Sequence, residues 1–419
     1  MTSSDRTAIR QGYVIYAVLC AGLVASQFFR VSNAVIAPEL MADLAIGTET
    51  MGVVNGTYFL AFAAMQIPAG MLLDRYGARR MVPGLFVLAV AGSVLYAAAQ
   101  SGPELIAGRA LIGIGCALGL MGPMVVIARW FEPERYARLI SLLFTVGGLG
   151  SLMASTPLAA VSEAIGWRGA FYLMAVLTGV IAVLIYLIVR DAPPGSSHEG
   201  PRRETMGEMW RGLREVLALR EMWWICAVQF VSYGTMLTIV GLWAGPYLND
   251  VHGLRGVDRG NALLGLNILL FAAVMLFSQT ERWLDSRKKA VMGGGCAAVA
   301  VLLVLAFVPG PGLWAALALL ALFTMASAFF MLIHAHARAI LPDRLIGRGL
   351  TLQNLSVMLG VFVIQALTGV IVGSFGPEGS EAPEIAYRAA FGFLALSLAA
   401  GLAFYARIAD VSPRGSETG

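Results

Sequence analysis

Charge is what this sequence lacks most. Only 13% of its 419 residues are charged, whereas 58% are hydrophobic, and the mean hydropathy is +0.77. A soluble domain carries about a quarter charged residues, and a single soluble core seldom reaches this length. Water is therefore a poor solvent for this chain. The composition predicts a protein that lies in the hydrocarbon of a membrane.

Metal-binding and catalytic patterns are also missing. The four cysteines lie in apolar runs without CxxC spacing, so we expect no disulfide, no metal site and no cofactor. There is no P-loop, HExxH motif or nucleophile elbow, and no soluble stretch large enough for catalysis. These absences argue against an enzyme and against ATP-driven transport. The net charge of +4 does not indicate a nucleic-acid partner.

Long apolar stretches are what the chain has instead. About 20 apolar residues span a bilayer as a helix, and the chain contains twelve such stretches. We therefore expect an all-α membrane protein with twelve transmembrane helices. The predicted spans are 13–37, 51–71, 83–100, 104–128, 138–161, 168–189, 222–247, 260–281, 290–308, 313–336, 349–373 and 386–407.

The loops predict the domain organisation and the orientation. The polar stretch 191–220 reads as a cytoplasmic linker, with an amphipathic helix around 206–219, between bundles at 13–190 and 221–408. If both termini (1–12 and 409–419) are cytoplasmic, 23 of the 29 basic residues fall on that side. Short loops and a bare helical core suggest a monomer in a bacterial inner membrane.

The two halves of the chain repeat one pattern. Ala128-Arg129-x-x-x-Pro133-Glu134-Arg135 recurs as Ala337-Arg338-x-x-x-Pro342-Asp343-Arg344, displaced by 209 residues. The stretch 70–80, GMLLDRYGARR, has a degraded counterpart in ERWLDSRKK at nearly the same offset. We therefore expect two pseudo-symmetric six-helix bundles that can move against each other about a site near the membrane midplane.

Three motifs resemble signatures of the major facilitator superfamily. They are Gly70-x-x-x-Asp74-Arg75-x-Gly77-x-Arg79-Arg80 after the second span, Arg109-x-x-x-Gly113-x-Gly115 in the fourth, and Gly166-Trp167-Arg168 at the sixth. The resemblance covers residues 13 to 408. It implies two bundles, a central cavity and alternating access of that cavity to the two sides of the membrane.

The resemblance also implies a role for the first motif. Asp74 is expected to contact the start of the eleventh span near Gly349, where a helix dipole favours negative charge, and to release it when the transporter changes state. Gly77 permits a tight turn. The alternative is that Arg75, Arg79 and Arg80 only set the topology. Arg109, Gly113 and Gly115 are expected to be structural or to take part in coupling.

Arg30 is the clearest polar group inside a span, where charge is costly and usually functional. Gln27, Arg30 and Asn33 recur at every third residue, which predicts one polar face of a helix. If that face lines a cavity, it is a solute-binding surface. The alternative is that Arg30 extends to the outer membrane interface.

No Asp or Glu lies in the middle of a predicted span, so the solute itself can supply negative charge to Arg30. A guanidinium binds a carboxylate or a phosphate through two parallel hydrogen bonds. We therefore expect a secondary or facilitated transporter of a small anionic metabolite, of carboxylate, phosphate or chelate type. The alternative is a proton-coupled exporter of drugs or metabolites, in which protons are the coupling ion.

Further solute-binding candidates lie in the second half of the chain. The seventh span corresponds to the first by pseudo-symmetry and offers polar and aromatic groups at helical spacing. Ordinary helix packing explains them equally well. His334 and His336 are expected to be interfacial rather than metal ligands, because their spacing puts them on different faces. The candidates are Gln229, Tyr233, Trp243, Asn267 and Gln365.

Overall fold

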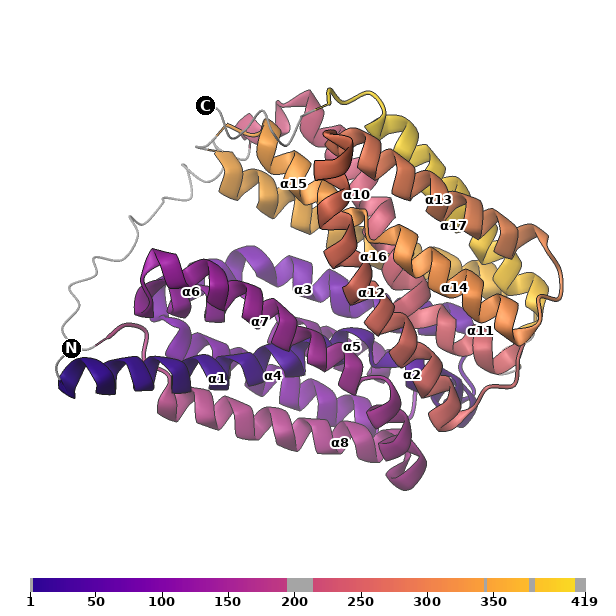
Figure 1. Cartoon of the computed structure of the whole chain (residues 1–419). Helices are drawn as coiled ribbons and strands as arrows, with labels where there is room; N and C mark the ends of the chain where they lie inside the picture. The colour runs from indigo at the N-terminus through magenta and orange to yellow at the C-terminus, as the bar shows by residue number, and fades with distance from the viewer. Residues whose placement is uncertain (1–2, 194–213, 343–344, 377–380, 411–419) are drawn as a thin grey trace. The chain divides into compact units, whose positions relative to one another are not determined.

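The structure is a computed structural model that describes residues 3–193, 214–342, 345–376 and 381–410 (Figure 1). The described residues are almost entirely helical, and no strand occurs among them. Most of the predicted linker, including residues 206–213 of its expected amphipathic helix, lies outside the described residues. The contacts divide the chain into two units, Met1–Asn33 with Thr57–Arg203 and Ala34–Gly56 with Glu204–Gly419.

Unit 1 contains most of the first half of the chain. Within it α4 packs against both α5 and α8, while α1 packs against α7. The helices are α1 (Ser3–Val31), the second part of α3 (Thr48–Tyr76), α4 (Ala78–Ala98), α5 (Gly102–Gly115), α6 (Met121–Trp130), α7 (Pro133–Met153) and α8 (Thr156–Ile188).

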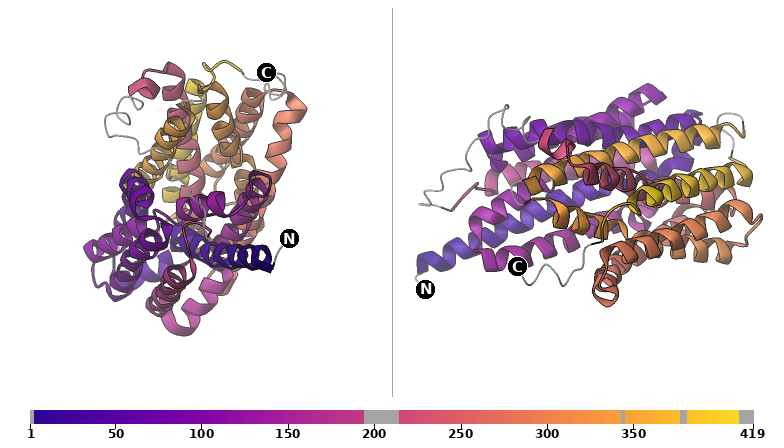
Figure 2. Two further views of the ribbon diagram at one scale, coloured as in Figure 1. Left: turned by 90° about the vertical axis from the view of Figure 1, so that its left-hand side faces the viewer. Right: turned by 90° about the horizontal axis from the view of Figure 1, so that it is seen from above.

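Unit 2 contains the second half of the chain together with residues 34–56. Its helices are α2 (Asn33–Leu44), the first part of α3, α10 (Arg220–Thr238), the π-helix η1 (Ile239–Trp243), α11 (Ala244–Asp250), α12 (Gly256–Leu284), α13 (Arg287–Phe307), α14 (Leu313–Ser327), α15 (Phe330–Ile340), α16 (Ile346–Gly373) and α17 (Glu384–Tyr405). The helices α13 and α17 run side by side (Figures 1 and 2).

The described helices match all twelve predicted spans. Within the described ranges, ten helical stretches are long and apolar enough to cross a membrane. One of them, Arg138–Ile188, holds both the fifth and the sixth predicted spans, which are separated where Gly166 leaves the helical conformation at φ 75°. The fourth predicted span is formed by α5 and α6, which are individually short because residues 116–120 interrupt the helix. The chain is thus a multi-pass membrane protein.

Small residues let the central helices of each unit approach closely. A Cβ at Gly92 would lie 2.7 Å from the carbonyl oxygen of Gly108, where α4 meets α5. A Cβ at Gly360 would lie 2.1 Å from the carbonyl oxygen of Phe230, where α16 meets α10. Because lipid is as apolar as the helices, such close packing is a main source of association in a membrane.

Candidate solute-binding and gating residues

Arg30 lies in the last turn of α1, where its charge interacts favourably with the helix dipole. The side chain is half-buried, and its guanidinium lies over the ring of Phe62 in α3 at 5.3 Å. Its charge acts on the buried Tyr58 and Cys116. These neighbours come from α3 and from the chain just after α5. Arg30 is therefore held within unit 1 by the faces of other helices.

The three polar residues of the first span do not form one continuous face, contrary to the sequence prediction. The helix is interrupted by a turn at Ser32, so that Asn33 begins α2. Asn33 is fully buried and its Oδ1 accepts a hydrogen bond from Tyr96 Oη at 3.1 Å. Gln27 lies against α7, where a side chain at Gly150 would collide with it. Contacts with different helices separate the three side chains.

Arg109 is fully buried in α5. Its Nη1 donates a hydrogen bond to the carbonyl oxygen of Phe29 at 2.7 Å, and its guanidinium lies over the rings of Tyr96 and Phe171 at 5.1 and 6.0 Å. Aromatic faces attract a buried cation. Arg109 therefore ties the end of α1 to α5, and its expected role in coupling stays a prediction.

Gly113 and Gly115 are the contact points of α5 with its neighbours. A Cβ at Gly113 would lie 2.3 Å from the carbonyl oxygen of Tyr58 in α3, and one at Gly115 would lie 2.4 Å from the backbone nitrogen of Ala89 in α4. No larger residue fits without moving a helix. In the described structure, both glycines are thus packing residues.

The loop after the second span is a single residue long. Gly77 separates α3 from α4 and has φ 78° and ψ 163°, a conformation that favours glycine. The backbone nitrogen of Arg79 donates to Asp191 Oδ1 at 3.0 Å, and Arg79 Nε donates to the carbonyl oxygen of Tyr186 at 3.1 Å. The end of α8 therefore holds Arg79.

The other charged residues of this loop are exposed. Asp74, Arg75 and Arg80 all lie on the surface of unit 1. One helical turn earlier, a Cβ added at Gly70 would meet nothing within 4 Å. The expected partner of Asp74 near Gly349 belongs to unit 2. That contact, and the role of the loop in conformational change, stay predictions.

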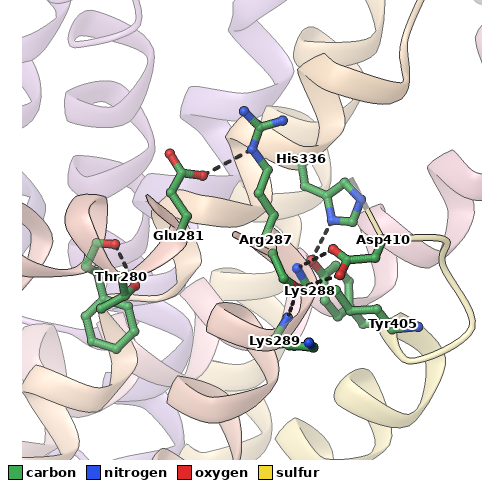
Figure 3. Close-up of polar contacts among 10 residues, drawn as sticks. Thr280, Glu281, Arg287, Lys288, Lys289, His336, Tyr405 and Asp410 are labelled. Atoms are coloured by element: carbon green, nitrogen blue, oxygen red, sulfur yellow. Dashed lines mark hydrogen bonds and ion pairs between the residues drawn. The ribbon is translucent and has the colours of Figure 1, made fainter. Parts of the chain in front are cut away.

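Both halves of the chain carry the same carboxylate cap, although the sequence analysis did not find it. In unit 1, Asp191 receives the backbone N–H at the start of α4. In unit 2, Asp410 Oδ1 accepts from the backbone nitrogen of Lys288 at the start of α13 at 3.1 Å, and its Oδ2 accepts from Ser286 Oγ (Figure 3). A carboxylate is favourable at a helix N-terminus. Each cap joins the end of the last membrane span of a half to the start of its third span: α8 to α4 in unit 1, and α17 to α13 in unit 2.

An aromatic N–H accompanies each cap. Trp130 Nε1 donates to the carbonyl oxygen of Arg190 at 2.7 Å, immediately before Asp191. His336 Nε2 lies 3.2 Å from the carbonyl oxygen of Ala409, immediately before Asp410. We call these paired arrangements the inner clasps. Their repetition agrees with the duplication that the sequence motifs predicted.

The candidates in the second half of the chain are mostly buried in unit 2. Gln229 Nε2 lies 3.1 Å from His334 Nδ1, and the half-buried Tyr233 packs edge-to-face on Phe330. Trp243 Nε1 donates to Thr368 Oγ1 at 2.8 Å. These contacts assign Trp243 to the packed interior. A solute-binding role stays a prediction for all five candidates.

The side chains of Asn267 and Gln365 are also buried in unit 2. Asn267 Nδ2 donates to the carbonyl oxygen of Leu263, one turn earlier in its own helix, at 2.9 Å. Gln365 is fully buried, and its Oε1 accepts a hydrogen bond from Asn55 Nδ2 at 3.0 Å. Asn55 comes from the first half of the sequence, so Gln365 takes part in a contact between distant segments rather than in an open surface.

Residues 34–56 form a tight contact with the C-terminal helices, which we call the outer seam. Thr48 Oγ1 donates to the carbonyl oxygen of Gly369 at 3.3 Å. A Cβ at Gly245 would lie 1.6 Å from the carbonyl oxygen of Ala34. The segment connects the first two predicted spans on the predicted outer side. The seam thus joins parts of the chain that the sequence assigned to different bundles.

Arg259 is the charged residue at the centre of the outer seam, and sequence reasoning missed it. It is 1% exposed, pairs with Glu39 at 2.5 Å, and donates to the carbonyl oxygen of Val35 at 2.6 Å and to Asn249 Oδ1 at 3.1 Å. The predicted eighth span began at residue 260, so Arg259 read as a loop residue. Its position directly before an apolar stretch was the only signal in the sequence that could have indicated its burial.

A cavity of about 380 Å³ opens beside this ion pair in unit 2. Its lining includes Glu39, Glu49 and Asp250. Asp250 Oδ2 accepts hydrogen bonds from Tyr387 Oη at 2.6 Å and from the backbone nitrogen of Ala382 at 3.0 Å. The cavity is part of the outer seam and depends on its packing.

The long apolar helices of the described residues define a multi-pass membrane protein. The sequence profile of the Major Facilitator Superfamily matches residues 18–325, and the chain belongs to that superfamily. A crystal structure of a bacterial homologue of the human lysosomal transporter Spinster is similar, with a TM-score of 0.75 and 18% identity, and the match covers 93% of this chain and 95% of that one. At this identity the likeness concerns the fold.

Relatives of known name are transporters of different solutes. An MFS-type efflux pump of Mycolicibacterium smegmatis is 27% identical, with 67% of each chain covered. The nitrate/nitrite transporter NrtP of a Picosynechococcus species is 24% identical, over 56% of this chain and 48% of the relative. A probable sulfoacetate transporter of Cupriavidus necator is 24% identical, over 64% and 63%. The matches span between about half and two thirds of these relatives.

Proposed function

We propose that this protein carries a small anionic solute across a bacterial cell membrane by alternating access, with both termini in the cytoplasm. The class of solute is inorganic oxyanions or small carboxylates, sulfonates and phosphates. Two of the relatives are named as transporters of such anions, nitrate or nitrite and sulfoacetate. The third, an efflux pump, defines the competing function.

The observation that carries this proposal is the placement of Arg30. Its guanidinium lies against the Phe62 ring inside a membrane-spanning unit, near the buried hydroxyl of Tyr58. A cation held in a surrounding of low dielectric constant attracts an anion much more strongly than it would in water. The planar guanidinium can also hold the two oxygens of an oxyanion together. The geometry supports Arg30 as the anion-binding group.

The outer seam and the loop around Asp74 supply the conformational side of the proposal. In the seam, Arg259 and Glu39 fasten residues 34–56 to the C-terminal helices. Release of this seam would open the solute path to the outside, and engagement of Asp74 with the eleventh span would close it to the cytoplasm. Contacts that alternate between two states are what an alternating-access cycle requires.

A thermal-shift screen of the purified protein in detergent tests the proposal. The probes are nitrate, sulfoacetate, an organic phosphate and a lipophilic cation, each measured on wild type, Arg30→Gln and Arg30→Lys. A ligand at a hundred times its dissociation constant stabilises the folded state by about 2.7 kcal/mol. We expect an anion to raise the melting temperature of wild type, and Arg30→Gln to lose the effect.

Arg255→Gln is the matched control, because Arg255 is 77% exposed and its loss removes the same charge from the surface. That variant should respond as wild type does. Stabilisation by the lipophilic cation alone, unaffected by the change at Arg30, would reject the anion proposal. It would favour the second candidate, export of drugs or metabolites, which the similarity to the efflux pump supports.

A further inference from the structure

Two of the four histidines lie inside membrane-spanning helices, and they are held differently. The ring of His336 is fully buried: its Nδ1 lies 2.6 Å from Tyr405 Oη and its Nε2 donates to the carbonyl oxygen of Ala409. Both nitrogens are thus engaged within the inner clasp, and Figure 3 shows the contact with Tyr405. His334 is half-buried, and its two polar neighbours are the Gln229 amide and the Phe330 carbonyl oxygen.

The helices α12 and α13, which pack against α15, carry charged groups beside the inner clasp, whereas Arg259 of α12 lies at the other end of that helix, in the outer seam. Glu281 of α12 pairs with Arg287 of α13 at 3.1 Å, and Arg287 and Lys288 act electrostatically on His336. From α10, the phenol of Tyr233 packs one turn before His334, against Phe330. On the described part of α16, Arg348 is the charged residue. Among the described residues, no charged side chain contacts His334. The amide of Gln229 is therefore the side chain that can respond to protonation of its imidazole.

Gln229 can serve either protonation state of His334. When the imidazole is neutral, Gln229 Nε2 donates to His334 Nδ1, which lies 3.1 Å away. Gln229 Oε1 then has no hydrogen-bond partner among the described residues, although the side chain is fully buried. A half-turn of the amide would present Oε1 to a protonated Nδ1–H instead. The pair can therefore accept a proton without moving a helix.

A row of buried hydroxyl groups continues from this pair along α10. Ser232, Thr235 and Thr238 follow Gln229 at every third position, and each is at most 3% exposed. Within the described structure their hydroxyl oxygens have no hydrogen-bond partners. Buried polar groups left in this way are costly and call for an explanation. Hydroxyls that both donate and accept are suited to passing a proton along a helix.

We propose that His334 and Gln229 form a proton-binding site whose occupancy is linked to that of the transported anion. His334 Nδ1 takes one proton from water, the imidazole gains one positive charge, and the Gln229 amide turns to accept the new N–H. One proton bound with one monoanion leaves the net charge of the carrier unchanged. This inference rests on the anion-transport function proposed above and assigns its coupling ion.

The first test needs no substrate. Nitrogen NMR of protein labelled with ¹⁵N-histidine in lipid nanodiscs reports the protonation of each imidazole, and the signal of His334 is assigned by its loss in His334→Gln. We expect this signal to show reversible protonation as the pH is lowered from about 8 to about 5. A signal of His334 that stays unchanged over this range would overturn the inference. The titration is measured on wild type, so the result does not depend on how well His334→Gln folds.

The second test links the proton to the anion. Proteoliposomes loaded with a pH-sensitive dye are given an inward gradient of nitrate or sulfoacetate, and internal pH and anion uptake are both recorded. We expect wild type to acidify the interior, Gln229→Leu and His334→Gln to lose acidification, and His252→Gln, which removes a histidine outside the spans, to behave as wild type does. Anion uptake by wild type without acidification would overturn proton coupling and leave the anion proposal standing. No uptake of any anion would instead reject the proposed function.

Discussion

Loss of Arg259 should open the outer seam. Arg259→Gln removes the ion pair with Glu39 and the hydrogen bond to the carbonyl oxygen of Val35. Hydrogen bonds to charged groups contribute about 1.5–3 kcal/mol, and screening reduces the share of Glu39, whose side chain is 42% exposed. We expect a loss of about 2 kcal/mol, which shifts the equilibrium toward the open seam about 30-fold at 1.4 kcal/mol per tenfold.

Cysteine labelling measures this shift. Thr48→Cys, in a variant without the four native cysteines, places a thiol in the seam, where Thr48 is 9% exposed. The rate of reaction with a membrane-impermeant maleimide then follows the population of the open seam. We expect the rate to rise about 30-fold in Arg259→Gln, in proportion to the shift in equilibrium.

Arg255→Gln is again the control, because Arg255 is exposed and forms an exposed ion pair with Glu381 at 3.6 Å. Its labelling rate should stay close to that of the parent, since exposed pairs contribute little. An unchanged rate in Arg259→Gln, with the protein folded, would refute the reasoning that this guanidinium holds the seam closed.

Further predictions concern the inner clasps and the short loop that contains His252. Gly77→Ala should lower the melting temperature. A residue with a β-carbon is destabilised by about 1–2 kcal/mol at φ 78°, and the added Cβ would also collide with Asp191. Asp191→Asn and Asp410→Asn should each cost about 0.5–1 kcal/mol in denaturant unfolding, since each cap loses its interaction with a helix N-terminus; an effect in one half alone would contradict equivalent clasps. Burial lowers the pKa of His252 below its usual 6.5, so stability linked to this group is complete above that pH and is lost as the pH falls through the folded-state pKa. Melting curves of wild type and His252→Gln should therefore diverge only on the acid side, and parallel curves would reject the linkage.

The sequence predicted the helices well, because hydropathy and length are local properties. All twelve spans correspond to described helices, and the turn at Gly77 has the positive φ that its motif implied. Helix interruptions were missed where no local signal marks them. One case is Ser32, where α1 ends and α2 begins within the predicted first span, with Asn33 bonded to Tyr96 of α4.

The site was less predictable, because its contacts join residues far apart in the chain. Arg259 bonds Glu39 across 220 positions, and Gln365 bonds Asn55 across 310. Nothing in either local sequence announces the partner. The same holds for His334, because nothing in its local sequence indicates that the amide of Gln229 lies 3.1 Å from its ring. Arg30 could be proposed from the sequence because a charge inside an apolar span is itself a local signal, and its binding role stays a prediction.

Anion flux through the reconstituted protein is the most direct test of the whole account. Wild type, Arg30→Gln and Arg255→Gln are placed in proteoliposomes, and uptake of labelled nitrate and sulfoacetate is measured against a lipophilic cation. The account predicts saturable uptake of an anion by wild type and Arg255→Gln, and loss of that uptake in Arg30→Gln. Saturable anion uptake that is unchanged in Arg30→Gln, or transport of the cation alone, would contradict it.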